Sequence, residues 1–406
     1  MTANTKIDER AGHIGPHTWL RVGFTMFVIG FGANLFAPML QVYRQYDNMS
    51  NSSVTLMYGV YAAGLVPALL VCGPLSDRYG RRAILRPAIL MSALGSLILM
   101  MGVTGSEMIL FFGRFVAGFA VGMAMASGAA WIKQLSVHRP VAGPRRATIS
   151  VSAGFGGGPF IAGLVAEFLP WEHVLPYVVH LTLVALVLPW MWRTPETQPR
   201  EVVRDDGAVV KRRLVPRVAF TSKFLWAVAA WAPWVFGTVS VAFATMPTQV
   251  EVSRPIVFIG AIAVVALGTG VAIQPAAAKF LERTTPQWMP LSLLGLGAAC
   301  LGMLSGAATV YLQWIPLAFL TAMLLGASYG VMMVAGLSEV EILAGKDDLG
   351  ALIGVFYALT YIGFFVPFVL SLVAPIVGMI TCLLFGAVVC VVSMVPVARA
   401  AAKAVH

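Results

Sequence analysis

Few charged side chains interrupt the long apolar runs of this 406-residue chain, and Arg114 is one that lies well inside such a run. It lies about seven residues, or about 10 Å at 1.5 Å per residue, inside a run long enough to cross a bilayer. A charge at such a depth costs at least about 2.5 kcal/mol on insertion scales, so Arg114 should face the inside of a helix bundle and have a partner. Asn34, Tyr61 and His180 are predicted at similar depth. Three roles stay open for Arg114: a hydrogen-bonded bridge between helices, a proton-coupling group, or an anchor for an anionic substrate.

His180 and several aromatic residues are further candidates for a binding site. Histidine changes its charge near neutral pH, so His180 could exchange a proton if it reached a cavity, although a buried histidine is more often a hydrogen-bonded core residue. Aromatic side chains at helical spacing in two later segments could line a cavity or could only pack: Trp226, Trp231, Trp234, Tyr357 and Tyr361. The acids nearest to membrane depth are Glu167, Glu339 and Glu341, each near the end of a segment. No carboxylate is therefore expected near the midplane.

Composition indicates which elements must position these residues. Of all residues, 59% are hydrophobic and 11% are charged, against about 25% charged in an ordinary soluble domain. A bilayer core needs about 20 apolar residues per helix. Runs of this length predict an all-α polytopic membrane protein with twelve transmembrane helices, at 20–43, 54–74, 83–104, 107–132, 147–168, 173–193, 223–246, 255–279, 288–307, 311–337, 349–371 and 375–397.

Basic residues are distributed unevenly among the breaks between these segments. They gather between the second and third, the fourth and fifth, and the sixth and seventh segments, whereas on the opposite side of the membrane only Arg44 and Arg254 lie near a loop. Because loops rich in lysine and arginine stay in the cytoplasm, we expect a multi-pass protein of the cell inner membrane with both termini cytoplasmic. The net charge of +10 then implies no nucleic acid, since the basic loops border the anionic cytoplasmic leaflet.

The longest polar break divides the segments six and six. This predicts an N-terminal six-helix bundle at 1–193, a cytoplasmic linker at 194–222 and a C-terminal six-helix bundle at 223–406. A weak internal repeat supports two pseudo-symmetric halves, because GPLSDRYGRR at 73–82 and QPAAAKFLER at 274–283 follow equivalent segments. Two related halves favour alternating access around a site near the midplane.

The segment GPLSDRYGRR at 73–82 is the strongest local motif, and it resembles the signature loop of the major facilitator superfamily. Its glycines allow a tight turn and a close approach of helices. In that family the acid approaches the start of helix eleven and helps to latch the cytoplasmic side in the outward-facing state, where a helix N-terminus stabilises a carboxylate. Helix eleven would start here just after Asp348, which could also attract an arginine of the motif. The expected latch residues are Gly73, Asp77, Arg78, Gly80, Arg81, Arg82 and Asp348.

Two further matches extend the resemblance over nearly the whole chain. Arg114-Phe-Val-Ala-Gly118 resembles the intramembrane arginine motif of the family. GFGGGPFIAG at 154–163 resembles the G-x-x-x-G-P-x-x-G-G motif of its antiporter branch, with Ala162 in place of one glycine. The residues that carry this second likeness are Gly154, Gly158, Pro159 and Gly163. Because glycine-rich helices also pack closely for purely structural reasons, packing remains the alternative. The Pro-Glu-Thr at 195–197 also resembles the family.

The resemblance implies a secondary active transporter that works by alternating access. We expect proton-coupled export of a small amphiphilic or drug-like molecule, with uptake of a small organic anion anchored by Arg114 as the alternative. Some multidrug exporters of the superfamily carry an acid in helix one for cationic drugs, whereas 20–43 has none, and Lys133 stands where many relatives carry an acid. A neutral, amphiphilic or anionic substrate is therefore expected rather than a cation.

Other functional classes find no support in the sequence. It contains no H-E-x-x-H motif and no cluster of carboxylates deep in the apolar runs, so an enzyme is not expected. The four cysteines lie in apolar segments without C-x-x-C spacing, so neither a metal nor a cofactor is expected. The expected partners are the small-molecule substrate, protons and the lipid bilayer, and we expect a monomer.

Overall fold

The computed structural model describes residues 15–139, 142–197, 215–283, 288–344 and 349–405. Within these ranges every regular element is a helix, and no strand occurs. Twelve helical stretches are long and apolar enough to cross a membrane. The predicted all-α fold with twelve spans is therefore confirmed.

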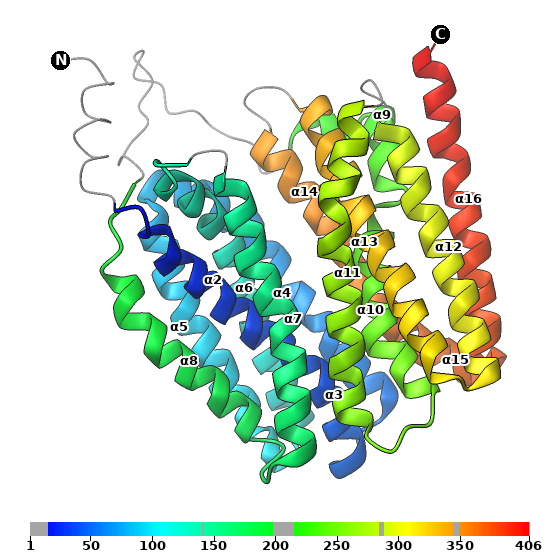
Figure 1. The fold of residues 1–406 in the computed structure, drawn as a ribbon, viewed down its shortest axis with the longest axis horizontal. Coiled ribbons are helices and arrows are strands. Elements are labelled where there is room, and N and C mark those ends of the chain that lie inside the picture. The colour runs from blue at the N-terminus through cyan, green and yellow to red at the C-terminus, as the bar shows by residue number, and fades with distance from the viewer. Residues whose placement is uncertain (1–14, 140–141, 198–214, 284–287, 345–348, 406) are drawn as a thin grey trace. The chain divides into compact units, whose positions relative to one another are not determined.

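The first six spans are mostly single helices (Figure 1). In order they are α2 (Trp19–Asn34) with α3 (Phe36–Tyr46), α4 (Asn51–Tyr79), α5 (Arg81–Met100) with η1 (Met101–Thr104), α6 (Glu107–Leu135), α7 (Gly143–Phe168) and α8 (Leu175–Trp192).

The seventh and eleventh spans are interrupted, whereas the other late spans are continuous. The seventh consists of α9 (Ser222–Phe224), η4 (Leu225–Ala229), α10 (Ala232–Ser240), η5 (Val241–Thr245) and η6 (Met246–Gln249), after the short η3 (Arg217–Phe220). The next three are α11 (Pro255–Arg283), α12 (Trp288–Leu312) and α13 (Ile315–Leu343). The eleventh consists of α14 (Leu349–Tyr361), η7 (Ile362–Phe365) and α15 (Val366–Val377), and the twelfth is α16 (Met379–Val405).

Two predicted breaks are misplaced, and the backbone explains why. The break predicted at 308–310 lies later, because α12 continues to Leu312 and Gln313 takes a positive φ of 52° before α13 starts. The side chain of Gln313 fixes that turn by donating to the carbonyls of Val310 and Gln249. The break predicted at 372–374 lies instead at Gly378, whose φ of 87° is one that glycine adopts readily.

Contacts between Cα atoms separate the chain into two compact units. Unit 1 holds the described residues up to Asn34, Ala63–Gly158, and those from Val174 to 197. Unit 2 holds Leu35–Ala62, Pro159–His173 and the described residues from 215 onward. The division into 1–193, 194–222 and 223–406 stays a prediction, and 198–214 lies outside the described residues.

Each unit has one helix that contacts most of the others. In unit 1, α2 packs against α5, α6 and α8. In unit 2, α13 packs against α10, α11, α12 and α14, while α12 also packs against α16 (Figure 1). The candidate functional residues below lie mainly on the helices that surround α2 and α13.

Candidate functional site

The end of α2 brings together three of the side chains predicted at similar depth. Arg114 of α6 donates from Nη1 to the carbonyl oxygen of Ala33 at 3.0 Å, and its side chain is 1% exposed. The next residue, Asn34, donates from Nδ2 to the carbonyl oxygen of Phe155 in α7 at 3.2 Å. Arg114 thus joins α6 to α2, as expected for a bridge between helices. Its acceptor is a neutral carbonyl, so this bond holds the guanidinium without neutralising its charge.

His180 of α8 is packed against the same end of α2. A Cβ at Gly32 would lie 2.3 Å from His180 Nε2, so only glycine leaves room for the ring. Nδ1 lies 2.7 Å from the hydroxyl of Ser96, Nε2 lies 3.4 Å from that of Ser92, and the ring stacks on Phe31 at 6.4 Å. A fully buried ring with a hydroxyl at each nitrogen favours the structural role for His180 over the proton-carrying one.

The motif at 154–163 makes two different packing contacts along α7. Within unit 1, a Cβ at Gly154 would lie 2.2 Å from the carbonyl oxygen of Phe27, and one at Gly158 would lie 2.3 Å from that of Phe31. These distances are shorter than any real Cβ contact, so both positions need glycine. By contrast, Gly156 faces open space. The motif glycines therefore differ from other glycines of the same helix.

Within unit 2, the rest of the motif packs against α11. A Cβ at Gly260 would lie 2.6 Å from the carbonyl oxygen of Pro159, and one at Gly163 would lie 3.2 Å from the carbonyl oxygen of Ile256. One turn beyond Gly163, the carboxylate of Glu167 accepts from the backbone N–H groups of Ile256 at 2.9 Å and Val257 at 3.1 Å. Glu167 therefore caps the start of α11. The sequence placed this acid at the end of its helix but gave no sign of its partner.

An aromatic cluster occupies unit 2 and includes three of the predicted site residues. We use this name for Tyr58, Tyr61, Phe236, Tyr329, Tyr357, Tyr361 and Phe364. Phe236 stacks on Tyr361 with ring centroids 4.5 Å apart, and Phe364 lies 5.1 Å from Phe236. Trp234 points elsewhere, because its Nε1 donates to the hydroxyl of Ser393 in α16 at 3.2 Å. The structure thus brings Tyr61, Tyr357 and Tyr361 together and separates Trp234 from them.

The interruption of the eleventh span, η7, packs against α10 of the seventh span beside this cluster. A Cβ at Gly363 of η7 would lie 2.3 Å from both the backbone nitrogen of Gly237 and the carbonyl oxygen of Pro233. The hydroxyl of Ser240 donates to the carbonyl oxygen of Gly363 at 3.1 Å. Irregular backbone inside a membrane protein is tolerated where protein or a polar cavity satisfies it.

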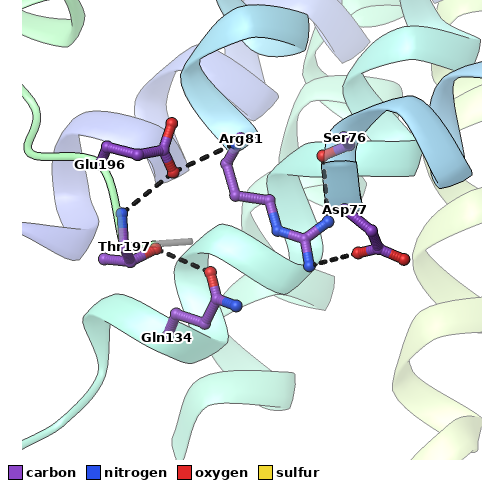
Figure 2. Close-up of polar contacts among 6 residues, drawn as sticks. All are labelled: Ser76, Asp77, Arg81, Gln134, Glu196 and Thr197. Atoms are coloured by element: carbon purple, nitrogen blue, oxygen red, sulfur yellow. Dashed lines mark hydrogen bonds and ion pairs between the residues drawn. The ribbon is translucent and has the colours of Figure 1, made fainter. Parts of the chain in front are cut away.

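The signature segment at 73–82 is mostly helical, which corrects the predicted loop. The second span, predicted to end at 74, continues to Tyr79, and Gly73 lies inside α4, where an added Cβ would meet nothing within 4 Å. The turn depends on Gly80 alone, whose φ is 102°. The guanidinium of Arg81 then reaches back to Asp77 at 2.7 Å and to the hydroxyl of Ser76 at 3.0 Å (Figure 2). A second glycine is unnecessary because one residue makes the whole turn.

The remaining latch residues have local contacts or lie outside the described chain. The guanidinium of Arg78 lies over the ring of Tyr79 at 5.2 Å. The contact expected between Asp77 and the start of helix eleven stays a prediction. Asp348 lies outside the described residues.

A residue without an assigned role, Glu196, caps α5. Its carboxylate accepts from the backbone N–H group of Arg81 at 3.1 Å (Figure 2) and from that of Arg82 at 2.8 Å. Its neighbours are fixed in turn, because Trp131 donates to the carbonyl oxygen of Pro195 at 3.2 Å and Thr197 bonds Gln134 at 2.7 Å. The Pro-Glu-Thr at 195–197 was the sequence signal that could have identified Glu196, and the structure shows that this segment caps a helix.

Among the described residues, no group of three or more His, Cys, Asp or Glu side chains could hold a metal ion. The four cysteines are free thiols. The expectation of no metal and no cofactor stays a prediction.

Comparisons with known proteins agree with this architecture. The model of the Major Facilitator Superfamily matches residues 22–368. Two solved structures are similar over nearly their whole length at 12% identity, which is evidence for the fold alone. A POT family transporter in complex with 5-aminolevulinic acid gives a TM-score of 0.77 and covers 96% of this chain and 97% of that chain. The nucleoside transporter NupG gives 0.74 and covers 94% and 99%.

Two curated relatives match in sequence. The 3-(3-hydroxy-phenyl)propionate transporter of Escherichia coli (strain K12) is 29% identical over 171 residues, which are 40% of this chain and 40% of that protein. The Quinolone resistance protein NorB of Staphylococcus aureus (strain JH9) is 28% identical over 191 residues, which are 45% of this chain and 39% of that protein. The chain thus spans about two fifths of the length of the curated relatives it matches.

Proposed function

This chain belongs to the Major Facilitator Superfamily and is a multi-pass membrane transporter rather than an enzyme, and we propose that it exports a small amphiphilic molecule in exchange for protons. In this proposal it works as a monomer by alternating access. It resides in the inner membrane with residues 1–17, 194–222 and 398–406 in the cytoplasm. Impermeant maleimide applied to intact cells should therefore leave single cysteines in these segments unlabelled, and labelling from outside would contradict the orientation.

The packing of the antiporter-like motif carries the export proposal. The likeness depends on Gly154, Gly158 and Gly163, and these are the positions where a Cβ would meet the backbone of α2 or α11 within 3.2 Å. Gly156 and Gly157 stand in the same helix, yet a Cβ there would meet nothing closer than 3.9 Å. General glycine richness would not produce this selectivity. The difference between the two sets of glycines supports a motif that sets how α7 packs against its neighbours.

The substrate class follows from the charges and rings near α2 and α10. The first span has no acidic residue to attract a cation, while Arg114 brings a buried positive charge to the end of α2. Aromatic rings of the cluster would stack on a planar apolar group. We therefore propose a neutral or anionic amphiphile that contains an aromatic ring. NorB, named for quinolone resistance, is similar to this chain and fits that class.

Uptake of a small organic anion is the second candidate, and Arg114 is the observation that favours it. A guanidinium that is 1% exposed would bind a carboxylate at two points. The relative named as a 3-(3-hydroxy-phenyl)propionate transporter suggests an aromatic carboxylate as the probe.

Accumulation in intact cells separates the two candidates. Cells that express the chain should hold less fluoroquinolone than cells that express Gly158→Ala, and a protonophore should abolish the difference. Gly158→Ala is expected to be inactive because its Cβ would lie 2.3 Å from the carbonyl oxygen of Phe31. Gly157→Ala is the matched control and should behave like wild type. Greater accumulation of 3-(3-hydroxyphenyl)propionate, with no change in fluoroquinolone, would favour uptake instead.

A further inference from the structure

The carboxyl group of Glu339 is buried without a partner near the end of α13. Its side chain has 0% exposure, and neither carboxylate oxygen has a hydrogen-bond partner in the described part of the chain. Glu341, two residues later on the same helix, is exposed. The other buried charged side chains that the structure describes have polar contacts, as Arg81 and Arg114 do above. Glu339 is therefore an exception that local sequence does not explain.

The elements that pack against α13 bring few charges to this carboxyl group. Lys223 of α9 is the cation whose charge acts on Glu339, but no ion pair joins the two within 4.0 Å. On α11, Lys279 and Glu282 are exposed. The packed segments α10, η4 and η5 contain no titratable side chain, and α12 and α14 contribute only uncharged thiol and phenol groups such as Cys300 and Tyr357.

The turn of α13 that precedes Glu339 is enclosed by aromatic rings. A Cβ at Gly336 would lie 2.3 Å from the ring of Phe356 and 3.1 Å from that of Trp231. Both rings are fully buried. An isolated carboxylate in such surroundings is far less stable than the neutral acid, because neither water nor a cation compensates its charge. The carboxyl group therefore retains its proton in this conformation.

We propose that Glu339 is the site that binds the coupled proton. This inference rests on the proposed proton-coupled export. Glu339 lies only four residues before the end of α13 at Leu343, or about 6 Å along the axis, so a small displacement would expose it to water. Approach of the Lys223 ammonium group to the carboxyl group would also favour release of the proton, since a neighbouring cation stabilises the carboxylate. With that end of α13 on the cytoplasmic side, the proton would be released where an exported substrate enters, as exchange requires.

Labelling with an apolar carbodiimide tests proton occupancy without any substrate. Dicyclohexylcarbodiimide takes up the acid proton on one nitrogen while the carboxyl oxygen bonds to its central carbon, and the adduct rearranges to a stable N-acylurea. In membranes that contain the full chain, Glu339 should be labelled at low pH, and the yield should fall as the pH is raised. The Glu341→Gln variant leaves Glu339 as the only acid of this region of α13 and should give the same yield. Absence of the adduct at low pH would overturn proton binding at Glu339.

Transport by Glu339→Gln tests whether this proton is the coupled one. In proteoliposomes the variant should exchange fluoroquinolone across the membrane at equilibrium but should lose accumulation driven by a pH gradient. Glu341→Gln should retain both. Gradient-driven accumulation by Glu339→Gln at the wild-type level would overturn the coupling role.

Failure of the proposed function itself gives a different result. Wild-type protein would then accumulate neither fluoroquinolone nor 3-(3-hydroxyphenyl)propionate under a pH gradient. The coupling role of Glu339 would be rejected with it, whereas the labelling yield would still report whether its carboxyl group binds a proton.

Discussion

Glu196 in unit 1 and Glu167 in unit 2 cap helices in the same way but are positioned differently. Each accepts the first two N–H groups of a helix, on α5 for Glu196 and on α11 for Glu167. Glu196 lies in the segment after α8, which Trp131 and Gln134 fix by hydrogen bonds. Glu167 lies on α7 itself, and the packing of Gly163 and Gly260 places it. One cap is thus positioned by polar side chains and the other by contact between two helix backbones.

This difference predicts that glycine-to-alanine substitutions near the two caps lower stability by different amounts. The largest effect should come from Gly260→Ala, because the new Cβ would lie 2.6 Å from the carbonyl oxygen of Pro159, and backbone cannot move aside cheaply. Such overpacking costs about 1–3 kcal/mol, and it should lower the melting temperature of the purified protein. Gly268→Ala on the same helix meets nothing within 4 Å and should not lower it, since alanine is the better helix former. Equal melting temperatures for the two variants would contradict the role of α7–α11 packing.

At the Glu196 cap the expected effect is the difference in stability between Gly80→Ala and Gly105→Ala, which should be somewhat smaller. Gly80 and Gly105 both have positive φ, of 102° and 72°. A Cβ at Gly80 would lie 2.6 Å from Glu196 Oε2, whereas one at Gly105 would meet nothing within 4 Å. Backbone strain costs both variants about 1–3 kcal/mol, and Gly80→Ala should lose additional stability by displacing the cap. Thermal unfolding of the two variants measures the difference. If Gly80→Ala is no less stable than Gly105→Ala, the cap contributes nothing.

The smallest expected effect concerns Glu167, which interacts both with Arg254 and with the start of α11. Arg254 is 62% exposed and its Nη1 lies 3.8 Å from Glu167 Oε1, so this surface pair contributes about 0–1 kcal/mol. Glu167→Gln weakens the cap and should cost about 0.5–2 kcal/mol. We therefore expect Arg254→Ala to melt close to wild type and Glu167→Gln to melt lower at the same salt concentration. The reverse order would mean that the ion pair, rather than the helix start, holds Glu167.

Hydropathy by itself determined the twelve spans and the all-α class. A span is a local average over about 20 residues, so an error in one residue does not change it. The motif at 154–163 also identified glycines at which the structure leaves no space for a Cβ, because close helix packing needs small residues at fixed intervals. Segment ends were less predictable. The signature segment continues as helix to Tyr79, and Gly80 alone makes the turn, because φ is a property of one residue and not of a motif.

The tertiary structure alone decided which polar groups meet. Glu339 and Glu341 are the same residue type two positions apart, yet one is fully buried and the other exposed, because successive helical positions face different neighbours. Tyr361 joins the aromatic cluster while Trp234 donates to Ser393, although both are aromatic residues of apolar membrane spans. The partners of Glu167 and Glu196 stand about 90 and 115 positions away along the chain. Sequence records each of these residues, but only folding brings a donor within hydrogen-bond distance of its acceptor.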